Sequence, residues 1–405
     1  MAGSSELQAG APSAPGTPAS SSHGTGWDAD GMTRIVIVGA GIMGLATAWA
    51  LTRRGERPIV LDRFGRGHRH GASHGATRNF NNAYLDAHYL DLLQRAREGW
   101  DALGDVDGEP LLRRHGLVTH GTGADLGGVG GGLDAIAARL GERGIAADLL
   151  SAAEAQARWP GMRFETDVLF SSDAGVARAS AALIELERRV LAGGGDVRWG
   201  ARVAGIDDRG DAGAIVRLDP GDGSAGTVID ADVVVLTAGA WTERLAPGIR
   251  LPRLTVTEET PAHFAPRDQT APWPSFNHFV EPGRFPAPVY GMPTPGEGIK
   301  VGLHRVGDVV DPDARTERIT HADTLAEYVR EWMPGLDPAS AVHLSCTYTS
   351  TDDSAFVLDR AGSIVVGAGF SGHGFKFAPG IGETLADLAL DPAARAAEPF
   401  RLPGV

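Results

Sequence analysis

Residues 34–44 read Arg34-Ile-Val-Ile-Val-Gly-Ala-Gly-Ile-Met-Gly44, and residues 58–62 read Pro58-Ile-Val-Leu-Asp62. The first five residues are almost all β-branched, as in a parallel strand that is covered on both faces. The glycines that follow fit G-x-G-x-x-G, and Asp62 closes a second strand about 20 residues further on. With a helix expected over residues 45–54, this order predicts a dinucleotide-binding βαβ unit.

Each residue of this motif has a physical task. Gly39 makes the tight turn, Gly41 lets the backbone approach a pyrophosphate, and Gly44 lets the helix pack on the sheet. The helix N-terminus presents unpaired N–H groups to the phosphates. Asp62 is placed to hold ribose hydroxyls. The alternative is a βα turn with a purely structural role.

The loop after the second strand bears on which dinucleotide is bound. It reads Arg63-Phe-Gly-Arg-Gly-His-Arg-His-Gly-Ala-Ser-His-Gly-Ala-Thr-Arg78, where a nicotinamide enzyme would normally continue its alternation of strands and helices. A loop so rich in donors and glycine suits a larger cofactor. Its histidines, His68, His70 and His74, have no neighbouring carboxylate or cysteine that completes a metal site, and no metal is predicted.

Later segments repeat the same architecture. We expect a helix over residues 179–192, strands over 196–199 and 201–206, and a buried strand that ends in a small-residue turn over 231–241. A final strand, glycine turn and helix are expected over 363–370, 371–378 and 379–390. The predicted fold class is α/β, a Rossmann-like domain interleaved with an α+β domain built on a mixed sheet. The predicted boundaries are 32–110, 171–247 and 341–392 for the nucleotide-binding domain, 111–170 and 248–340 for the substrate domain, and 1–31 for a disordered extension.

Counts over the whole chain narrow the function. The 405 residues carry a net charge of -14, which gives no attraction for nucleic acid, and no apolar run is long enough to span a membrane. The one cysteine, Cys346, excludes an intramolecular disulfide and points to the reducing cytoplasm. The chain has two lysines, Lys300 and Lys376, in an arginine-rich background. Lysine can lose its proton near neutral pH when buried, whereas arginine stays charged.

Together these residues resemble a family, the FAD-dependent amine oxidases typified by monomeric sarcosine oxidase and N-methyltryptophan oxidase, within the D-amino-acid-oxidase superfamily. The resemblance covers residues 34–390. Besides the glycine motif with Asp62, it rests on these segments: His74-Gly-Ala-Thr-Arg78, Gly239-Ala-Trp241, Gly298-Ile-Lys-Val-Gly-Leu-His304, Cys346-Thr-Tyr-Thr349 and Gly369-Phe-Ser-Gly-His-Gly-Phe-Lys-Phe377.

The resemblance implies a cytoplasmic, monomeric FAD enzyme that oxidises a secondary amine or N-methyl amino acid and passes the electrons to molecular oxygen. It implies a thioether between Cys346 and the flavin, and an oxygen-activating role for Lys300. The implied cofactor residues are Gly39, Gly41, Gly44, Asp62, Arg63, His74, Thr77, Arg78, Val203, Gly239, Trp241, Cys346, Gly374, Phe375 and Lys376. The implied catalytic residues are Lys300, Lys376, Tyr290, His304 and Tyr348. Without the resemblance, Cys346 reads as a buried thiol and Lys300 as a hairpin lysine.

One position departs from the family pattern. Sarcosine oxidases have an arginine three residues after the Thr-Arg pair of the flavin loop, where it binds the substrate carboxylate together with the lysine that matches Lys376. Here that position is Asn81. We therefore expect a bulkier or carboxylate-free amine, or an amino acid bound differently. The competing hypotheses are an imine-forming dehydrogenase or desaturase, a nicotinamide-dependent reductase, and a non-catalytic flavin-binding protein.

Overall fold

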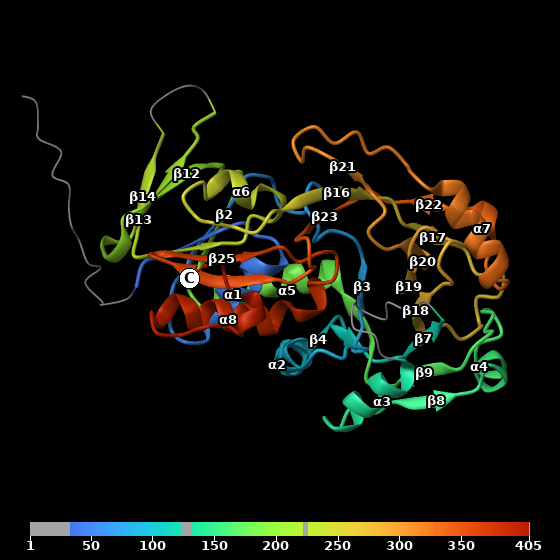
Figure 1. The fold of residues 1–405 in the computed structure, drawn as a ribbon. Helices are drawn as coiled ribbons and strands as arrows, with labels where there is room; N and C mark the ends of the chain where they lie inside the picture. The colour runs from blue at the N-terminus through green and yellow to red at the C-terminus, as the bar shows by residue number, and fades with distance from the viewer. Residues whose placement is uncertain (1–32, 123–131, 222–225, 405) are drawn as a thin grey trace, which may run out of the picture. The chain divides into compact units, whose positions relative to one another are not determined.

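The computed structural model describes residues 33–122, 132–221 and 226–404, so the predicted extension 1–31 lies outside the described residues. Within these ranges the strands form a mostly parallel sheet of six strands, a mixed sheet of eight strands and several smaller sheets (Figure 1). The predicted α/β class with a second, mixed sheet is confirmed. The predicted domain boundaries stay a prediction.

The six-stranded sheet brings the glycine motif and the C-terminal segment together. Across the sheet its strands are β11 (Asp196–Trp199), β2 (Ile59–Asp62), β1 (Ile35–Val38), β15 (Val233–Leu236), β25 (Ile364–Ala368) and β24 (Val357–Ala361). The first five run parallel, and β24 pairs antiparallel with β25. Because the carboxyl ends of parallel strands meet at one edge, the turns after β1, β2, β15 and β25 all converge there, which is where open α/β sheets bind ligands.

Both faces of this sheet are covered, as the continuous apolar run of β1 predicts. Ile35 and Ile37 pack in the core formed with α1 (Ile42–Thr52), α5 (Ala179–Ala192) and α8 (Ala378–Leu390). Val36 and Val38 point to the other face and pack against the sheet of β12 (Val203–Asp208), β13 (Ala214–Leu218) and β14 (Val228–Ala231). Figure 1 shows the three helices on one side of the parallel sheet and β12–β14 on the other.

Glycines allow the helices under the sheet to pack closely. A Cβ atom at Gly382 of α8 would lie 2.6 Å from the backbone carbonyl carbon and oxygen of Ala46 in α1. A Cβ atom at Gly380 would lie 2.6 Å from the carbonyl oxygen of Leu92 in α2 (Ala87–Leu103). Any side chain at these positions would push the helix backbones apart.

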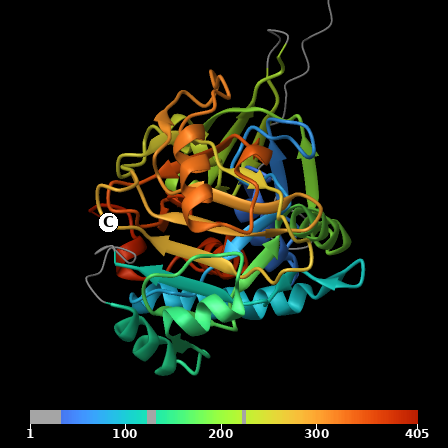
Figure 2. The ribbon, with the colours of Figure 1, turned by 90° about the vertical axis from the view of Figure 1, so that its right-hand side faces the viewer.

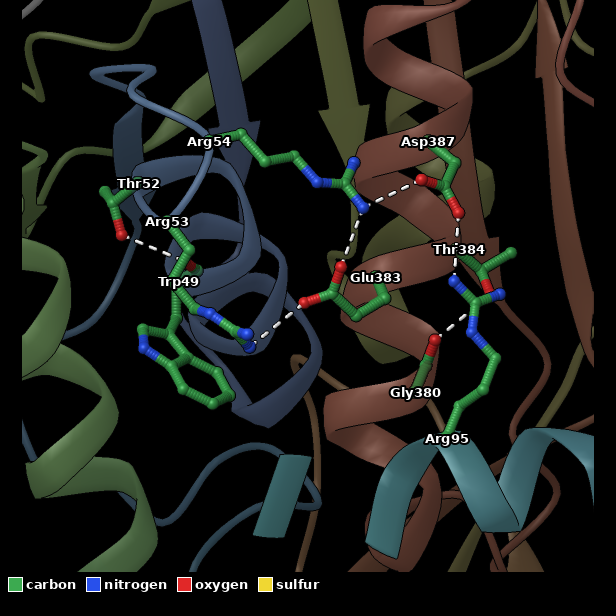
Figure 3. Close-up of polar contacts among 9 residues, drawn as sticks. All are labelled: Trp49, Thr52, Arg53, Arg54, Arg95, Gly380, Glu383, Thr384 and Asp387. Carbon is green, nitrogen blue, oxygen red and sulfur yellow. Dashed lines mark hydrogen bonds and ion pairs between the residues drawn. The ribbon is translucent and has the colours of Figure 1, made fainter. Parts of the chain in front are cut away.

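Ion pairs join the exposed edges of the same three helices (Figure 3). The Arg54 guanidinium, just after α1, lies 2.7 Å from both Glu383 and Asp387 of α8, and Arg95 of α2 lies 3.0 Å from Asp387. Such exposed pairs each contribute about 0–1 kcal/mol. The close packing at the glycines, not the ion pairs, therefore fixes the helix positions.

The eight-stranded sheet forms the second core. Its strands, in order, are β22 (Val342–His343), β17 (Ala262–Phe264), β20 (Gly298–Leu303), β19 (Val289–Thr294), β18 (Ser275–Phe279), β7 (Leu117–Gly121), β9 (Val168–Ser171) and β8 (Asp148–Leu150). Only β18 and β7 pair in parallel, so the sheet is mixed. Helix α7 (Ala322–Trp332) packs on it through Tyr328 and Trp332 (Figure 2).

Shorter elements complete the described chain. They are β3 (Thr77–Phe80), β4 (Asp105–Val106), β5 (Glu109–Pro110), β6 (Leu112–Arg113), β10 (Gly175–Arg178), β16 (Thr255–Glu259), β21 (Asp308–Val309), β23 (Cys346–Ser350), α3 (Leu133–Gly141), α4 (Ala152–Arg158), α6 (Thr242–Leu245), η1 (Gly210–Ala212), η2 (Gly239–Trp241), η3 (Pro338–Ser340), η4 (Phe375–Phe377) and η5 (Glu398–Phe400). The strand predicted to begin at Ala231 is β15, which begins at Val233 because Ala231 ends β14, and the small-residue turn predicted at its end is η2.

Candidate active site

One cavity of 1740 Å³ runs from the glycine turn to the C-terminal lysine. Pockets for drug-sized ligands measure about 300–1,000 Å³, so this cavity has room for a dinucleotide and a substrate together. All the predicted site residues line it except Gly44. A Cβ atom at Gly44 would lie 1.8 Å from the carbonyl oxygen of Gly39, so Gly44 has the packing role predicted for it.

The glycine turn leaves the start of α1 open to the cavity. Gly39 has a φ of +106°, and a Cβ atom there would lie 2.5 Å from the carbonyl oxygen of Thr237. Gly41 is the N-cap of α1 and provides no side-chain cap. Ser73, which the sequence did not single out, accepts a hydrogen bond from the Ile42 N–H at 3.0 Å. The remaining N–H groups of this turn suit phosphate oxygens.

Asp62 is held in place at the end of β2 and is 8% exposed. Its two carboxylate oxygens accept hydrogen bonds from the N–H groups of Ala40 and Phe64, each at 2.9 Å. The His68 Nε2 atom lies 3.6 Å from the same carboxylate. The acid is thus fixed beside the glycine turn.

Two predicted cofactor residues meet at a carboxylate that sequence reasoning missed. Asp313 pairs with the Arg63 guanidinium at 2.8 Å and accepts a hydrogen bond from the Trp241 indole N–H at 2.9 Å. The Arg63 guanidinium also lies 5.2 Å from the centre of the Trp241 ring, within range of a cation–π contact. These contacts order the loop after β2 against η2.

Arg78 is hydrogen-bonded to the backbone of the loop that precedes it, residues 72–77. Its guanidinium donates hydrogen bonds to the carbonyl oxygens of Ala72 at 2.7 Å, His74 at 2.5 Å and Thr77 at 2.9 Å. Both ring nitrogens of His74 are buried, and neither has a hydrogen-bond partner among the described residues. Burial, and next the charge of Arg78, lower the pKa of His74 to about 3. A neutral imidazole with no partner beside an open cavity suits a bound ligand.

Lys300 and Cys346 lie near this loop. Lys300, on β20, is 5% exposed, and its Nζ atom donates to the carbonyl oxygen of Thr77 at 3.4 Å. Burial, followed by the charge of Arg78, lowers its pKa to about 7. The Cys346 thiol, on β23, is partly exposed, and its Sγ atom is 4.0 Å from the carbonyl oxygen of Ala72. A buried amine and a partly exposed thiol therefore line the cavity.

The other predicted catalytic residues line the far end of the cavity. The hydroxyl groups of Tyr290 and Tyr348 are 3.4 Å apart, and the ring centre of His304 lies 5.7 Å from that of Tyr348. Burial raises the pKa of Tyr290 to about 12, while burial, then Arg305 and Lys376, lower that of His304 to about 4. These rings are neutral near pH 7.

Lys376 lies in η4, before α8 begins at Ala378, and is 4% exposed. Its Nζ atom donates to the carbonyl oxygen of His373 at 2.8 Å and lies 5.2 Å from the centre of the Tyr84 ring. Burial alone lowers its pKa to about 7. Tyr84 and His373, whose side chains are 3.2 Å apart, are site residues that sequence reasoning missed.

Asn81 also lines the cavity, as the alignment with the family motif implied. Its side-chain carbonyl oxygen accepts a hydrogen bond from the Ala83 N–H at 2.8 Å. The side-chain oxygen of Asn81 is therefore already hydrogen-bonded to the backbone. It carries no charge with which to bind a carboxylate.

Among the described residues, no group of three or more histidine, cysteine, aspartate or glutamate side chains has the arrangement of a metal site. No helix in the described part of the chain has the length and apolar character needed to cross a membrane.

The fold and the cavity define a class. The chain belongs to the family described as FAD dependent oxidoreductase, whose model matches residues 34–388. This confirms the predicted family and decides for FAD over a nicotinamide cofactor. The residues present fit FAD: the glycine turn and the open start of α1 suit its pyrophosphate, Asp62 its ribose, and the unpaired His74 its ring system.

Particular relatives extend the likeness over most of the chain. It is 34% identical to peroxisomal sarcosine oxidase of Homo sapiens, over 90% of this chain and 92% of that protein. It is 29% identical to N-methyl-L-tryptophan oxidase of Salmonella enteritidis, over 91% and 98%. Among solved structures it resembles NikD, described as an unusual amino acid oxidase essential for nikkomycin biosynthesis, with a TM-score of 0.77, 26% identity and coverage of 90% and 96%.

Proposed function

We propose that this protein is an FAD-dependent oxidase that acts on the CH–NH bond of a secondary amine, in particular of an N-methyl amino acid, to give an imine and hydrogen peroxide. The observation that carries the proposal is that the two lysines of the chain, Lys300 and Lys376, are both buried in the one cavity that fits FAD. The names of the sarcosine and N-methyltryptophan oxidase relatives support the same reaction.

Bound FAD supplies the redox chemistry, taking a hydride from the carbon next to nitrogen and passing two electrons to dioxygen. The protein binds and orients the amine. The Lys376 ammonium is placed to pair with a substrate carboxylate, and such pairing favours its charged form. The neutral rings of Tyr290, Tyr348 and His304 shape the cavity around the amine. A buried, uncharged wall of this kind favours the neutral amine, which has a lone pair to support hydride loss.

The first experiment separates the two half-reactions. Anaerobic mixing of the purified protein with N-methyl amino acids and other secondary amines should bleach the flavin absorbance. Lys300→Met should then slow reoxidation by oxygen far more than bleaching, because a cation near the reacting oxygen stabilises developing negative charge. Lys300→Arg, which keeps a charge, is the matched control. Equal slowing of both half-reactions would contradict the role of Lys300.

We also propose that Cys346 carries the flavin through a thioether. The partly exposed thiol lines the cavity, 4.0 Å from the flavin loop at Ala72. Flavin fluorescence should follow the protein band on a denaturing gel, and Cys346→Ser should abolish it while the folded variant still binds FAD. Complete release of flavin from the wild type on denaturation would refute the bond.

Asn81 supports a substrate other than sarcosine. The family binds the substrate carboxylate with an arginine and a lysine, whereas here only Lys376 is charged. A small carboxylate substrate therefore loses one of its two ionic contacts. We expect Asn81→Arg to lower the KM for sarcosine relative to that for bulkier amines. A micromolar KM for sarcosine in the wild type would contradict this inference.

Product assays distinguish the remaining hypotheses. Peroxide with formaldehyde indicates demethylation, peroxide alone indicates imine formation within the substrate, and neither indicates a dehydrogenase. A protein that keeps its flavin colour with every amine would be a binding protein.

We also propose that the protein is cytoplasmic, which its single cysteine supports. We propose a monomer, with the nucleotide-binding and substrate domains divided as the sequence predicts.

A further inference from the structure

Residues 311–315 lie in the connection between β21 and α7 (Figure 1) and contact three elements that line the cofactor cavity. Asp313 reaches the loop after β2 through Arg63 and reaches η2 through Trp241. Arg244 of α6 bonds to Asp311 at 2.7 Å and also contacts Asp313. This 311–315 segment is therefore anchored on the nucleotide-binding side of the cavity by charged side chains.

Arg315, at the end of the segment, makes a buried ion pair. Its Nε atom lies 3.1 Å from the Glu258 carboxylate, and the two side chains are 7% and 4% exposed. The same guanidinium donates a hydrogen bond to the carbonyl oxygen of His70 at 2.9 Å and contacts the Ser345 hydroxyl. The Ser345 hydroxyl donates to Glu258 at 2.5 Å. A planar guanidinium can hold three acceptors in a fixed arrangement, which a flexible ammonium cannot.

These contacts fix the two segments on either side of the only thiol. Ser345 immediately precedes Cys346, and Glu258 lies on β16, which pairs with the strand of Cys346. His70 lies two residues before Ala72, whose carbonyl oxygen is 4.0 Å from the Cys346 Sγ atom. One side chain, Arg315, therefore sets the separation between the flavin loop and the start of β23.

Stability alone is a weak reason for such a pair. Burying two charges costs desolvation energy that their attraction often fails to recover, and apolar residues of similar volume are frequently as stable. A buried pair does fix geometry, because each charge would be left unpaired if the segments moved. The arrangement thus suits a part of the molecule where the position of one atom matters.

We propose that Arg315 is a positioning residue that sets the Cys346 Sγ atom for its bond to the flavin. This inference rests on the proposed function. In the bond-forming reaction sulfur joins the 8α carbon of the ring, the thiol and the methyl group each lose one proton, and two electrons remain on the ring. Dioxygen, the oxidant of the proposed reaction, takes up these electrons and two protons as hydrogen peroxide.

The test measures the rate of bond formation apart from catalytic activity. Full-length apoprotein, made under riboflavin limitation, is mixed with saturating FAD, and the fluorescent band on a denaturing gel is followed with time. The variant is Arg315→Met combined with Glu258→Gln, which leaves no buried charge unpaired. The matched control is Arg318→Met in the same connection, because that side chain is 71% exposed and pairs with Asp308 at the surface.

We expect the double variant to form the bond about 10–100-fold more slowly than the wild type, since a misplacement of about 1 Å can cost about 100-fold. Arg315→Lys should be intermediate, and Arg318→Met should match the wild type. FAD affinity, measured by fluorescence quenching in a Cys346→Ser background, should change less than the rate. Loss of affinity with an unchanged rate at saturating FAD would overturn the positioning role.

The failure of this inference is distinguishable from the failure of the proposed function. If the wild type and the double variant form the bond at the same rate, Arg315 is not a positioning residue, and the proposed function stands. If the wild type never retains flavin after denaturation, the proposed thioether falls, and this inference falls with it. Bleaching by amines would then still test the oxidase reaction separately.

Discussion

The most direct consequence of the structure concerns the two lysines. Burial lowers the pKa of both Lys300 and Lys376 from 10.5 to about 7. Because the chain has two lysines, isotope-labelled lysine in the cofactor-free protein should give two side-chain NMR signals, which Lys300→Met would assign. We expect both signals to titrate near pH 7.

The magnitude follows from the size of the pKa change. One pKa unit is about 1.36 kcal/mol, so a fall from 10.5 to about 7 corresponds to about 5 kcal/mol per lysine. The unfolded chain keeps these lysines protonated up to pH 10.5, whereas the folded protein releases the protons near pH 7. The unfolded state therefore binds more protons in this window, and the free energy of unfolding rises with pH from 7 to 10.5. This contribution is lost progressively as the pH falls from 10.5 to about 7, and below pH 7 it no longer changes.

The groups around each lysine make the titration specific. Arg78 lowers the pKa of Lys300, whereas Cys346 and Glu297 raise it; for Lys376 the cause is burial alone. A carboxylate ligand at the substrate end should therefore raise the pKa of Lys376 and leave that of Lys300 in place. If both NMR signals showed lysine side chains that stay protonated up to pH 9, the reasoning would be refuted, because both ammonium groups would then be hydrated.

Two further predictions concern stability. Gly382→Ala should lower the free energy of unfolding, measured by urea titration, by about 1–3 kcal/mol, because the new Cβ atom would lie 2.6 Å from the Ala46 backbone. The control is Gly141→Ala in α3, which should not destabilise the fold because a Cβ atom there would have no atom within 4 Å. His278, whose pKa burial lowers to about 3, stays neutral in the folded protein and titrates at 6.5 when unfolded, so it should cost about 3 kcal/mol of stability as the pH falls from 6.5 to 4. The same acid titration should be flatter in His278→Phe, and equal slopes would contradict this account.

Local pattern predicted the nucleotide-binding unit well. The strand of residues 34–38 and the helix over 179–192 were predicted to within a residue, because their apolar periodicity and flanking glycines are local signals. The first helix begins at Ile42, three residues earlier than expected, because the backbone at Gly41 is extended and acts as the N-cap. The strand predicted from Ala231 begins instead at Val233. Ala231 is the last residue of β14, and no local signal in the sequence separates the end of that hairpin from β15.

The site was predicted only where a motif marks it. Ser73, Tyr84, Asp313 and Arg315 take part in the cavity or its supports, yet none belongs to a pattern with recognised spacing. His373 lies within the quoted segment 369–377, but that pattern gave it no role. Asp313 meets Arg63 across a sequence separation of 250 residues. Such pairs form because the two large sheets bring distant loops together, and this arrangement is not encoded in any one segment.

The amino-acid sequence by itself determined the βαβ unit, its glycine turn with Asp62, and the presence of two lysines and one cysteine in the segments that resemble the family, because these depend on local pattern and residue identity. Only the tertiary structure decided that both lysines are buried, which lowers their pKa values, and that Arg315 joins the segments around Cys346. Desolvation and ion pairing depend on what surrounds a group from all sides, and here the surroundings come from strands and loops far apart in the chain.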